Sequence, residues 1–274
     1  MVFGHGTADA AEEASYLVAH ALELQPDRLP ARLSTRPSPR QRALALRLIE
    51  RRIKERKPAA YLVREAWLAD CRFYVDERVI VPRSHIAGLL REQLAPWIGD
   101  PGKVRSALDL CTGSGCLAVL LARSFPRVKV DAADISPDAL AVARINIRRH
   151  RLDKRVRLVE SDLFSALRGK RYDLVISNPP YVTAGAMRRL PREYRHEPRI
   201  ALAGGADGLA AVRGIVRSAR AHLNPGGLLV VEVGSGRRRV ERSFPRSEFF
   251  WPETVPGDPV FIAAREQLPK GRKD

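Results

Sequence analysis

Several features are scarce in this 274-residue sequence, and each absence excludes a class of protein. Its three cysteines, Cys71, Cys111 and Cys116, are odd in number and unevenly spaced, which indicates neither a disulfide framework nor a zinc site. No apolar run approaches the roughly 20 residues that a membrane helix needs. The first residues lack the basic and apolar regions of a secretory signal. We therefore expect a protein of the reducing cytoplasm with no metal site and no membrane contact.

Aromatic residues make up only 6% of the chain, and 31 acidic residues stand against 48 basic ones, for a formal net charge of +17. A basic balance is typical of proteins that contact nucleic acid or a ribonucleoprotein, but an arginine-biased genome produces the same balance. Only 8 of the basic residues are lysine, and the arginines lie in short clusters, such as 237–239. The charge therefore leaves non-specific contact with RNA open.

The first part of the chain has the pattern of a small helical unit. Apolar residues at helical spacing predict helices over 8–24 and 41–56, with a proline-rich loop over 25–40 between them. Residues 73–83 combine β-branched and aromatic residues at strand spacing around a turn at Asp76-Glu77. This pattern predicts a β-hairpin that connects the helical unit to the rest.

Strands and helices alternate in the remainder, which predicts an α/β fold with a mainly parallel sheet covered by helices on both faces. The expected strands are 106–110, 128–133, 156–160, 172–177 and 227–233, with a last strand pair in 249–264. The expected helices are 86–98, 116–124, 137–149 and 207–222, and a long irregular insertion follows residue 177.

A glycine-rich loop follows the first of these strands. In Asp109-Leu-Cys-Thr-Gly113-Ser-Gly115 the glycines let the backbone approach a ligand, and the helix that follows offers free N–H groups. The loop alone is a weak signal, because it also fits the dinucleotide pattern G-x-G-x-x-A. A carboxylate at Asp109 suits a ligand ammonium group better than a pyrophosphate.

Two more carboxylates are expected at strand ends. Asp134 ends the second strand, where it can accept from ribose hydroxyls, and Asp162 ends the third, where it can meet an adenine amino group with Leu163 on the ring. Each carboxylate could instead cap a helix, and an NAD site would share Asp134. Three carboxylates at three successive strand ends favour a ligand crevice.

The fourth strand ends in Ser177-Asn178-Pro179-Pro180-Tyr181. Prolines cannot continue a hydrogen-bonded ladder, so Asn178 is held at the strand end and the Pro179 carbonyl is free to accept. A planar –NH2 group would find two acceptors there, with the Tyr181 ring beside it. A proline-rich turn without a ligand is the alternative interpretation.

Together, DLCTGSG over 109–115, Asp134, Asp162 and NPPY over 178–181 resemble the class I S-adenosylmethionine-dependent methyltransferases that act on nitrogen, and in particular the protein-glutamine methyltransferases. The helical N-terminal unit and the VPR sequence at 81–83 match that family, so the resemblance covers nearly the whole chain. One branch of the family methylates peptide-chain release factors, and the other methylates the third large-subunit ribosomal protein. The segments 73–90 and 190–209 resemble the second branch. His85 and Gly88 depart from it, since a proline and an acidic residue are usual there.

The resemblance implies S-adenosylmethionine as cofactor and a large-subunit ribosomal protein, free or within a ribosomal precursor, as substrate. It implies a helical substrate-recognition domain over 1–72, a hairpin-and-helix linker over 73–100 and a cofactor-binding catalytic domain over 101–274. The implied catalytic and substrate-binding residues are Asn178, Pro179, Pro180 and Tyr181. The implied cofactor-binding residues are Asp109, Cys111, Thr112, Gly113, Ser114, Gly115, Asp134, Ile135, Asp162, Leu163 and Asn178.

Four other functions remain as alternatives. A release-factor methyltransferase would use the same site chemistry. A DNA or RNA exocyclic-amine methyltransferase fits the positive charge, but few aromatic residues are present to stack a flipped base, and no separate target-recognition domain is evident. A non-catalytic assembly factor would not need the intact glycine loop and NPPY. An NAD dehydrogenase would leave NPPY and Asp109 unexplained.

Overall fold

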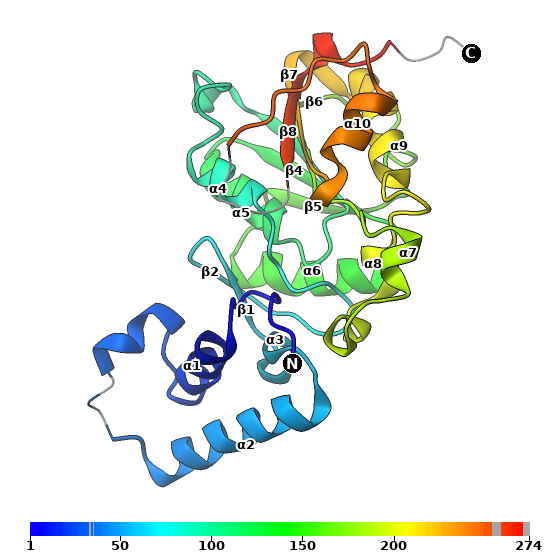
Figure 1. The fold of residues 1–274 in the computed structure, drawn as a ribbon. Coiled ribbons are helices and arrows are strands. Elements are labelled where there is room, and N and C mark those ends of the chain that lie inside the picture. The colour runs from blue at the N-terminus through cyan, green and yellow to red at the C-terminus, as the bar shows by residue number, and fades with distance from the viewer. Residues whose placement is uncertain (33, 35, 254–258, 271–274) are drawn as a thin grey trace.

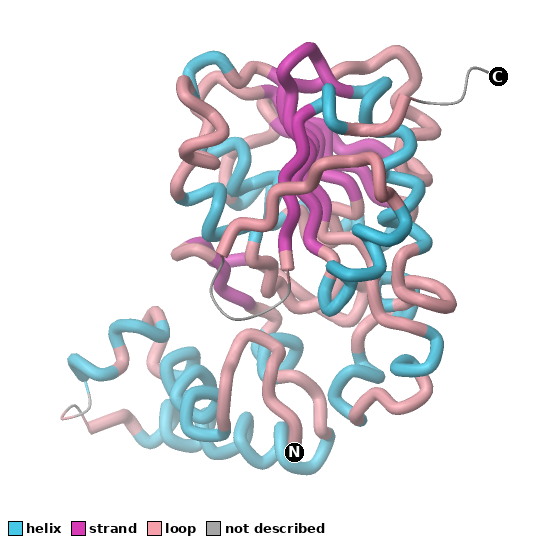
Figure 2. The backbone as a smooth tube through the Cα atoms, turned by 45° about the horizontal axis from the view of Figure 1, so that its top comes forward, coloured by secondary structure: helices cyan, strands magenta, loops and turns pink. Residues whose placement is uncertain are grey.

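A six-stranded sheet forms the centre of the larger, C-terminal unit (Figures 1 and 2). The computed structural model describes residues 1–32, 34, 36–253 and 259–270. The strands are β3 (Ser106–Leu110), β4 (Lys129–Asp134), β5 (Val156–Glu160), β6 (Tyr172–Ser177), β7 (Leu223–Glu232) and β8 (Val260–Ala264). Their order is β5-β4-β3-β6-β7-β8, and only the β7–β8 pair is antiparallel. The expected α/β fold with a mainly parallel sheet is confirmed.

Helices cover both faces of the sheet, because its strands are apolar on both sides. On one face pack α4 (Ile86–Arg91), α5 (Cys116–Ser124) and α6 (Pro137–Arg149), and on the other α9 (Ala210–Ala219) and α10 (Arg237–Ser243). Ser136 caps α6 by accepting from the Ala139 N–H at 3.2 Å, and Pro137 pre-sets the first turn. The bounds predicted for β3, β5, β6, α5 and α6 are confirmed.

The N-terminal unit lies below the sheet in Figure 1 and consists of α1 (Ala10–Ala21), α2 (Pro39–Glu55) and α3 (Ala59–Val63). Asp9 caps α1, and Ser38 and Gln41 form a capping box at the start of α2. Leu17, Leu48 and Ala59 form its small core. The two predicted helices are confirmed. The loop between them holds two 3-10 turns, and its residues 33 and 35 lie outside the described residues.

A β-hairpin does connect the two units, but the prediction that it spans 73–83 is wrong. The hairpin is formed by β1 (Ala66–Leu68) and β2 (Cys71–Phe73), and its turn residues Ala69 and Asp70 have φ of +47° and +61°. Downstream, the side chain of Asp76 accepts from the Arg78 N–H at 3.1 Å and closes a local turn. The apolar alternation of the expected hairpin reflects burial of Val75, Val79 and Val81 against Ala139 and Val142 of α6 rather than strand pairing.

Other element bounds also differ from the prediction. The helix expected over 86–98 ends at Arg91, because Gln93 and Leu94 adopt φ of +51° and +57°, outside the right-handed helical region. The helix expected from residue 207 begins at Ala210, after Gly208 at φ +82°. In 249–264 the structure has β8 and an isolated Phe250–Ile262 bridge, since Pro252 and Pro259 have no N–H to donate to a ladder. Residues 254–258 lie outside the described residues.

Short elements complete the described chain. The insertion after β6 contains α7 (Ala184–Met187) and α8 (Arg199–Leu202). The 3-10 turns are Pro26–Arg28, Pro30–Arg32, Pro101–Lys103, Arg192–His196, Arg220–His222, Gly234–Gly236 and Arg265–Gln267.

Glu193 attaches this insertion to the N-terminal unit. Its carboxylate is fully buried and accepts from the Val2 N–H at 3.0 Å and from Arg56 Nε at 2.6 Å, with Arg52 Nη1 at 3.7 Å. Burial opposes ionisation, but the hydrogen bonds from Arg56 and from the Val2 backbone outweigh it and lower the pKa of Glu193 to about 2.

Glu197 attaches the insertion to the linker before α4. It is also buried, accepts from the Val81 N–H at 3.0 Å, and receives both terminal nitrogens of Arg83, at 2.6 and 2.8 Å. The two carboxylates therefore fix the insertion against segments more than 100 residues earlier in the chain.

The variant Glu193→Gln should reduce the free energy of unfolding at pH 7 by about 3 kcal/mol, because Arg56 and the Val2 N–H lose the charged acceptor whose pKa they lower from 4.5 to about 2. A carboxylate with a lowered pKa stabilises the fold above its unfolded pKa. The difference between wild type and variant should therefore shrink as the pH falls from 4.5 towards 2. Urea unfolding at a series of pH values measures this difference, and a difference that is constant over that range would contradict the assignment.

Candidate active site

The strand order creates a crevice between β3 and β6. From β3 the chain winds outward through β4 to β5, then returns to place β6 on the other side of β3, and ligands bind at the carboxyl ends of strands at such a switch point. The glycine loop follows β3 and NPPY follows β6. Two motifs that lie more than 60 residues apart in sequence are thus brought to the two sides of one crevice.

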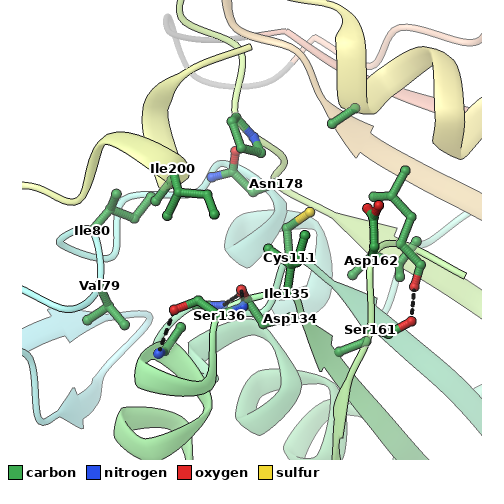
Figure 3. Close-up of a pocket in the computed structure, with 18 of the residues that line it drawn as sticks. Val79, Ile80, Cys111, Asp134, Ile135, Ser136, Ser161, Asp162, Asn178 and Ile200 are labelled. Atoms are coloured by element: carbon green, nitrogen blue, oxygen red, sulfur yellow. Dashed lines mark hydrogen bonds between the residues drawn. The ribbon is translucent and has the colours of Figure 1, made fainter. Parts of the chain in front are cut away.

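A first cavity of about 350 Å³ opens in this crevice (Figure 3). The predicted site residues that line it are Cys111, Gly113, Asp134, Ile135, Asp162, Leu163, Asn178 and Pro180. In Figure 3, Asn178 and Asp134 lie on different walls, and Asp162 comes from the loop after β5. The structure therefore brings together residues from the ends of four neighbouring strands.

Asp134 is the carboxylate with the clearest role in this cavity. Its Oδ2 accepts from the Gly113 N–H and its Oδ1 from the Ser136 N–H, both at 2.9 Å. Burial raises the pKa of Asp134 and these backbone bonds oppose that rise. Each carboxylate oxygen has a further lone pair, so the aligned side chain can accept from ligand hydroxyls as well.

Four residues predicted to bind a ligand do not line this cavity: Asp109 at the end of β3, and Thr112, Ser114 and Gly115 in the loop. Asp109 has no exposed surface and accepts from the Thr112 hydroxyl at 2.5 Å, and burial raises its pKa to about 7. A Cβ on Gly115, at φ +77°, would lie 3.0 Å from Cβ of Ala143 in α6. The hydrogen bond of Asp109 and the close packing of Gly115 on α6 therefore fix the conformation of the loop.

Two residues in the cavity wall have unusual backbone geometry. Cys111 and Leu163 adopt φ of +58° and +47°, which side chains other than glycine rarely do. Such backbone geometry is found at ligand sites as well as in turns like that of Ala69 and Asp70. Burial raises the pKa of the Cys111 thiol, which keeps the thiol protonated and unsuited to nucleophilic chemistry.

A second cavity of about 520 Å³ adjoins the first and shares Ile80, Asn178 and Ala201 with it. It is lined also by Val2, Gly4, Arg83, Pro179, Tyr181, Val182, Leu190, Pro191, Tyr194 and Leu202. The N-terminal segment, the linker and the insertion therefore build this cavity together with NPPY. Sequence reasoning did not identify Ile80, Arg83 or Tyr194 as site residues, although they belong to segments that carried the family resemblance.

Metal and membrane features are not found in the described part of the chain. It contains no cluster of three or more His, Cys, Asp or Glu side chains suited to a metal ion. None of its helices has the length and apolar character needed to cross a membrane.

Two family models match the sequence, the PrmC N-terminal domain over residues 4–63 and the methyltransferase small domain over residues 89–191. The ribosomal protein uL3 glutamine methyltransferase of Burkholderia pseudomallei is 52% identical, with 98% of this chain and 90% of that protein covered. The proteins of the same name from Bordetella pertussis and Bradyrhizobium diazoefficiens are 51% and 47% identical, covering 98% and 97% of this chain and 90% and 86% of theirs. The chain belongs to the protein-glutamine methyltransferase family.

Solved structures agree with this family's fold. The hMettl16 catalytic domain in complex with MAT2A 3′UTR hairpin 6 is similar with a TM-score of 0.55 at 13% identity, covering 81% of this chain and 80% of that chain. A methyltransferase from Pyrococcus furiosus has a TM-score of 0.50 at 19% identity, covering 70% of this chain and 88% of that chain. The class I Rossmann-like methyltransferase fold is thus confirmed.

In this methyltransferase, three glycines hold Tyr181 of NPPY in place. A Cβ on Gly208 would lie 2.4 Å from the Tyr181 carbonyl oxygen, and one on Gly204 would lie 2.7 Å from its Cα. On the other side, a Cβ on Gly234 would lie 2.5 Å from Cδ2 of the Tyr181 ring. Backbone and ring therefore fit where only glycine leaves room.

The variant Gly208→Ala should lower methyl transfer by displacing Tyr181, and it should also destabilise the fold. Gly169→Ala is the matched control, because Gly169 has a similar φ of +75° but nothing within 4 Å of an added Cβ. Both variants should lose about 1 kcal/mol of stability from the unfavourable φ, and only Gly208→Ala should lose activity. Equal activity of the two variants, measured beside their thermal unfolding, would contradict this role of Gly208.

Proposed function

We propose that the protein transfers the methyl group of S-adenosylmethionine to the side-chain amide nitrogen of a glutamine in ribosomal protein uL3. The observation that carries the proposal is the position of Asn178, which lines both cavities. A cofactor in the first cavity and an amide in the second would meet at this residue. The curated relatives named uL3 glutamine methyltransferases support the choice of substrate.

The first cavity suits the cofactor. The Asp134 carboxylate is held by two backbone N–H groups and can accept from both ribose hydroxyls, with Ile135 beside it. Asp162 and Leu163 would contact the adenine, and the strand-end loop of Cys111, Thr112, Gly113, Ser114 and Gly115 would support the rest. When bound, S-adenosylmethionine supplies an electrophilic sulfonium methyl group. Beneath the loop Asp109 accepts from the Thr112 hydroxyl, and contact of its carboxylate with the ligand ammonium group stays a prediction.

NPPY performs the positioning step in our proposal. An amide nitrogen is a weak nucleophile, so the enzyme must align it with the methyl group and exclude water. The Asn178 side-chain oxygen and the Pro179 carbonyl accept its two hydrogens, Pro180 keeps the turn out of the ladder, and Tyr181 flanks the amide. As the nitrogen becomes positive these acceptors bind it more strongly, which stabilises the transition state over the ground state. The product proton then leaves to water.

The N-terminal unit contributes to substrate recognition in this proposal, because Val2 and Gly4 line the cavity beside NPPY. We propose residues 1–72 as the recognition domain, 73–100 as the linker and 101–274 as the catalytic domain. The substrate is uL3 either free or within a ribosomal precursor, with the basic surface contacting RNA non-specifically in the second case. The free cysteines fit action in the cytoplasm.

The decisive experiment follows a labelled methyl group from S-adenosylmethionine. Undermethylated uL3, ribosomal precursors, release factor and unmethylated DNA are offered in parallel, and peptide mass spectrometry locates the label. Label on a uL3 glutamine is the expected result. Label on the release factor would keep the chemistry and change the substrate, whereas label on DNA alone, or on nothing, would refute the proposal.

The variant Asn178→Ala should reduce kcat by about 100-fold, the usual loss when one positioned transition-state hydrogen bond is removed. Its affinity for S-adenosylmethionine, measured by calorimetry, should fall much less than kcat, because Asp134 and the glycine loop still hold the cofactor. A variant that kept more than a tenth of the activity would refute the role given to Asn178.

The variant Asp134→Asn should bind S-adenosylmethionine about 10- to 100-fold more weakly, because hydrogen bonds to a charged acceptor contribute about 1.5–3 kcal/mol. Asp138→Asn is the control, since Asp138 is an exposed carboxylate in the first turn of the adjoining helix α6. If both variants bind the cofactor equally well, Asp134 does not contact the ribose.

A further inference from the structure

We infer that Arg83 donates a hydrogen bond to the carbonyl oxygen of the substrate amide and so fixes the plane of that amide. The inference rests on the proposed function and adds a substrate-binding residue outside NPPY. Arg83 lies in the linker between the hairpin and α4, and it lines the second cavity together with Asn178 and Pro179.

Arg83 has hydrogen-bond capacity left for a ligand. Among the described residues, its Nη1 donates to the Val81 carbonyl at 3.0 Å and to Glu197 Oε1 at 2.6 Å, and its Nη2 donates to Glu197 Oε2 at 2.8 Å. A guanidinium carries five N–H groups, so the Nε–H and the second Nη2–H take no part in these bonds. The side chain remains 21% exposed in a cavity wall.

The substrate needs such a donor. A carboxamide presents two N–H donors at one end and an acceptor oxygen at the other, and an acceptor buried without a partner loses the hydrogen bonds it had in water. Asn178 and Pro179 satisfy only the N–H end. Much of the remaining wall has apolar side chains, which can donate nothing to the oxygen: Ile80, Val182, Leu190, Ala201 and Leu202.

Glu197 makes Arg83 suitable for this task. Two hydrogen bonds to the buried Glu197 carboxylate fix the plane of the Arg83 guanidinium. The Arg83 side chain therefore loses little conformational entropy when substrate binds. The carboxylate also offsets the positive charge. An unpaired cation at the oxygen would draw electron density away from the amide nitrogen, whereas the Arg83–Glu197 pair donates a hydrogen bond without net charge.

In this arrangement the protein would form hydrogen bonds to the substrate amide only at the edges of the amide plane. Contacts in the amide plane, to Asn178 and Pro179 at the nitrogen and to Arg83 at the oxygen, leave open the face of the nitrogen that Tyr181 does not flank. Methyl transfer uses the lone pair that is perpendicular to this plane. The amide thus presents a face to the first cavity, from which the methyl group arrives.

The test uses two substitutions of Arg83 and the substrate form that the methyl-transfer experiment identifies. Arg83→Lys keeps the charge but loses the second branch of donors, and Arg83→Met with Glu197→Gln removes the pair without leaving a buried charge alone. Each is assayed for kcat and KM. Binding is compared for uL3 and for uL3 in which the target glutamine is methionine, with S-adenosylhomocysteine bound.

Both variants should raise KM for uL3 by about 10- to 100-fold, the loss expected for one hydrogen bond to a charged group. They should bind methionine-substituted uL3 and S-adenosylhomocysteine like the wild type. Tyr194→Phe removes the neighbouring hydroxyl in the same cavity, and Arg238→Met removes an exposed arginine of α10. Neither control should alter the preference for glutamine over methionine.

If the Arg83 variants bound uL3 and methionine-substituted uL3 equally more weakly than the wild type does, Arg83 would have only a structural role. That result would overturn the inference. Loss of the glutamine preference in Tyr194→Phe, with the preference kept in the Arg83 variants, would also overturn it. Methylation of uL3 by the wild type with unchanged KM in both Arg83 variants would overturn the inference and leave the proposed function intact. Absence of methyl transfer by the wild type would refute both.

Discussion

The buried carboxylates of Glu193 and Glu197 are the constraint on which the substrate side of the site depends. The helices described in the insertion after β6 are short, and the rest of its regular structure is a 3-10 turn. Such short elements are not stable in isolation. Ion pairs and backbone hydrogen bonds to these two carboxylates hold the insertion against the N-terminal segment and the linker. The second cavity is lined by residues of these three segments, so these contacts help to shape it.

The parallel sheet was predictable because its signals are local. A buried strand appears in the sequence as a short apolar run between turn residues. The observed bounds of β3, β5 and β6 are the predicted ones. Ser136 and Pro137 mark the start of α6 in the same local way. The first cavity follows from this topology, since strand ends in a doubly wound sheet converge at the switch point.

The rest depends on contacts that sequence spacing does not reveal. Asp109 and Asp134 were both predicted to contact a ligand from strand ends, but Asp109 is enclosed beneath the loop and Asp134 lines the cavity. The pairing of Glu197 with the Val81 N–H joins positions 116 residues apart. The valine pattern in 73–83 signalled burial correctly, yet burial against α6 and burial in a hairpin produce the same alternation.

The structure also gives part of the positive charge an internal cause. Arg220 Nη1 donates to the carbonyls of Arg265, Glu266 and Leu268 at 2.9–3.0 Å, and Arg155 donates to those of Phe125 and Val128. A forked guanidinium can bridge several carbonyls in this way, and lysine cannot do so with fixed geometry. A carbonyl has no formal charge. Each arginine that bonds to carbonyls instead of a carboxylate therefore adds one positive charge that no acidic residue balances. A net charge of +17 therefore accumulates in part from packing, and it weighs less in favour of a nucleic-acid substrate than the number alone suggests.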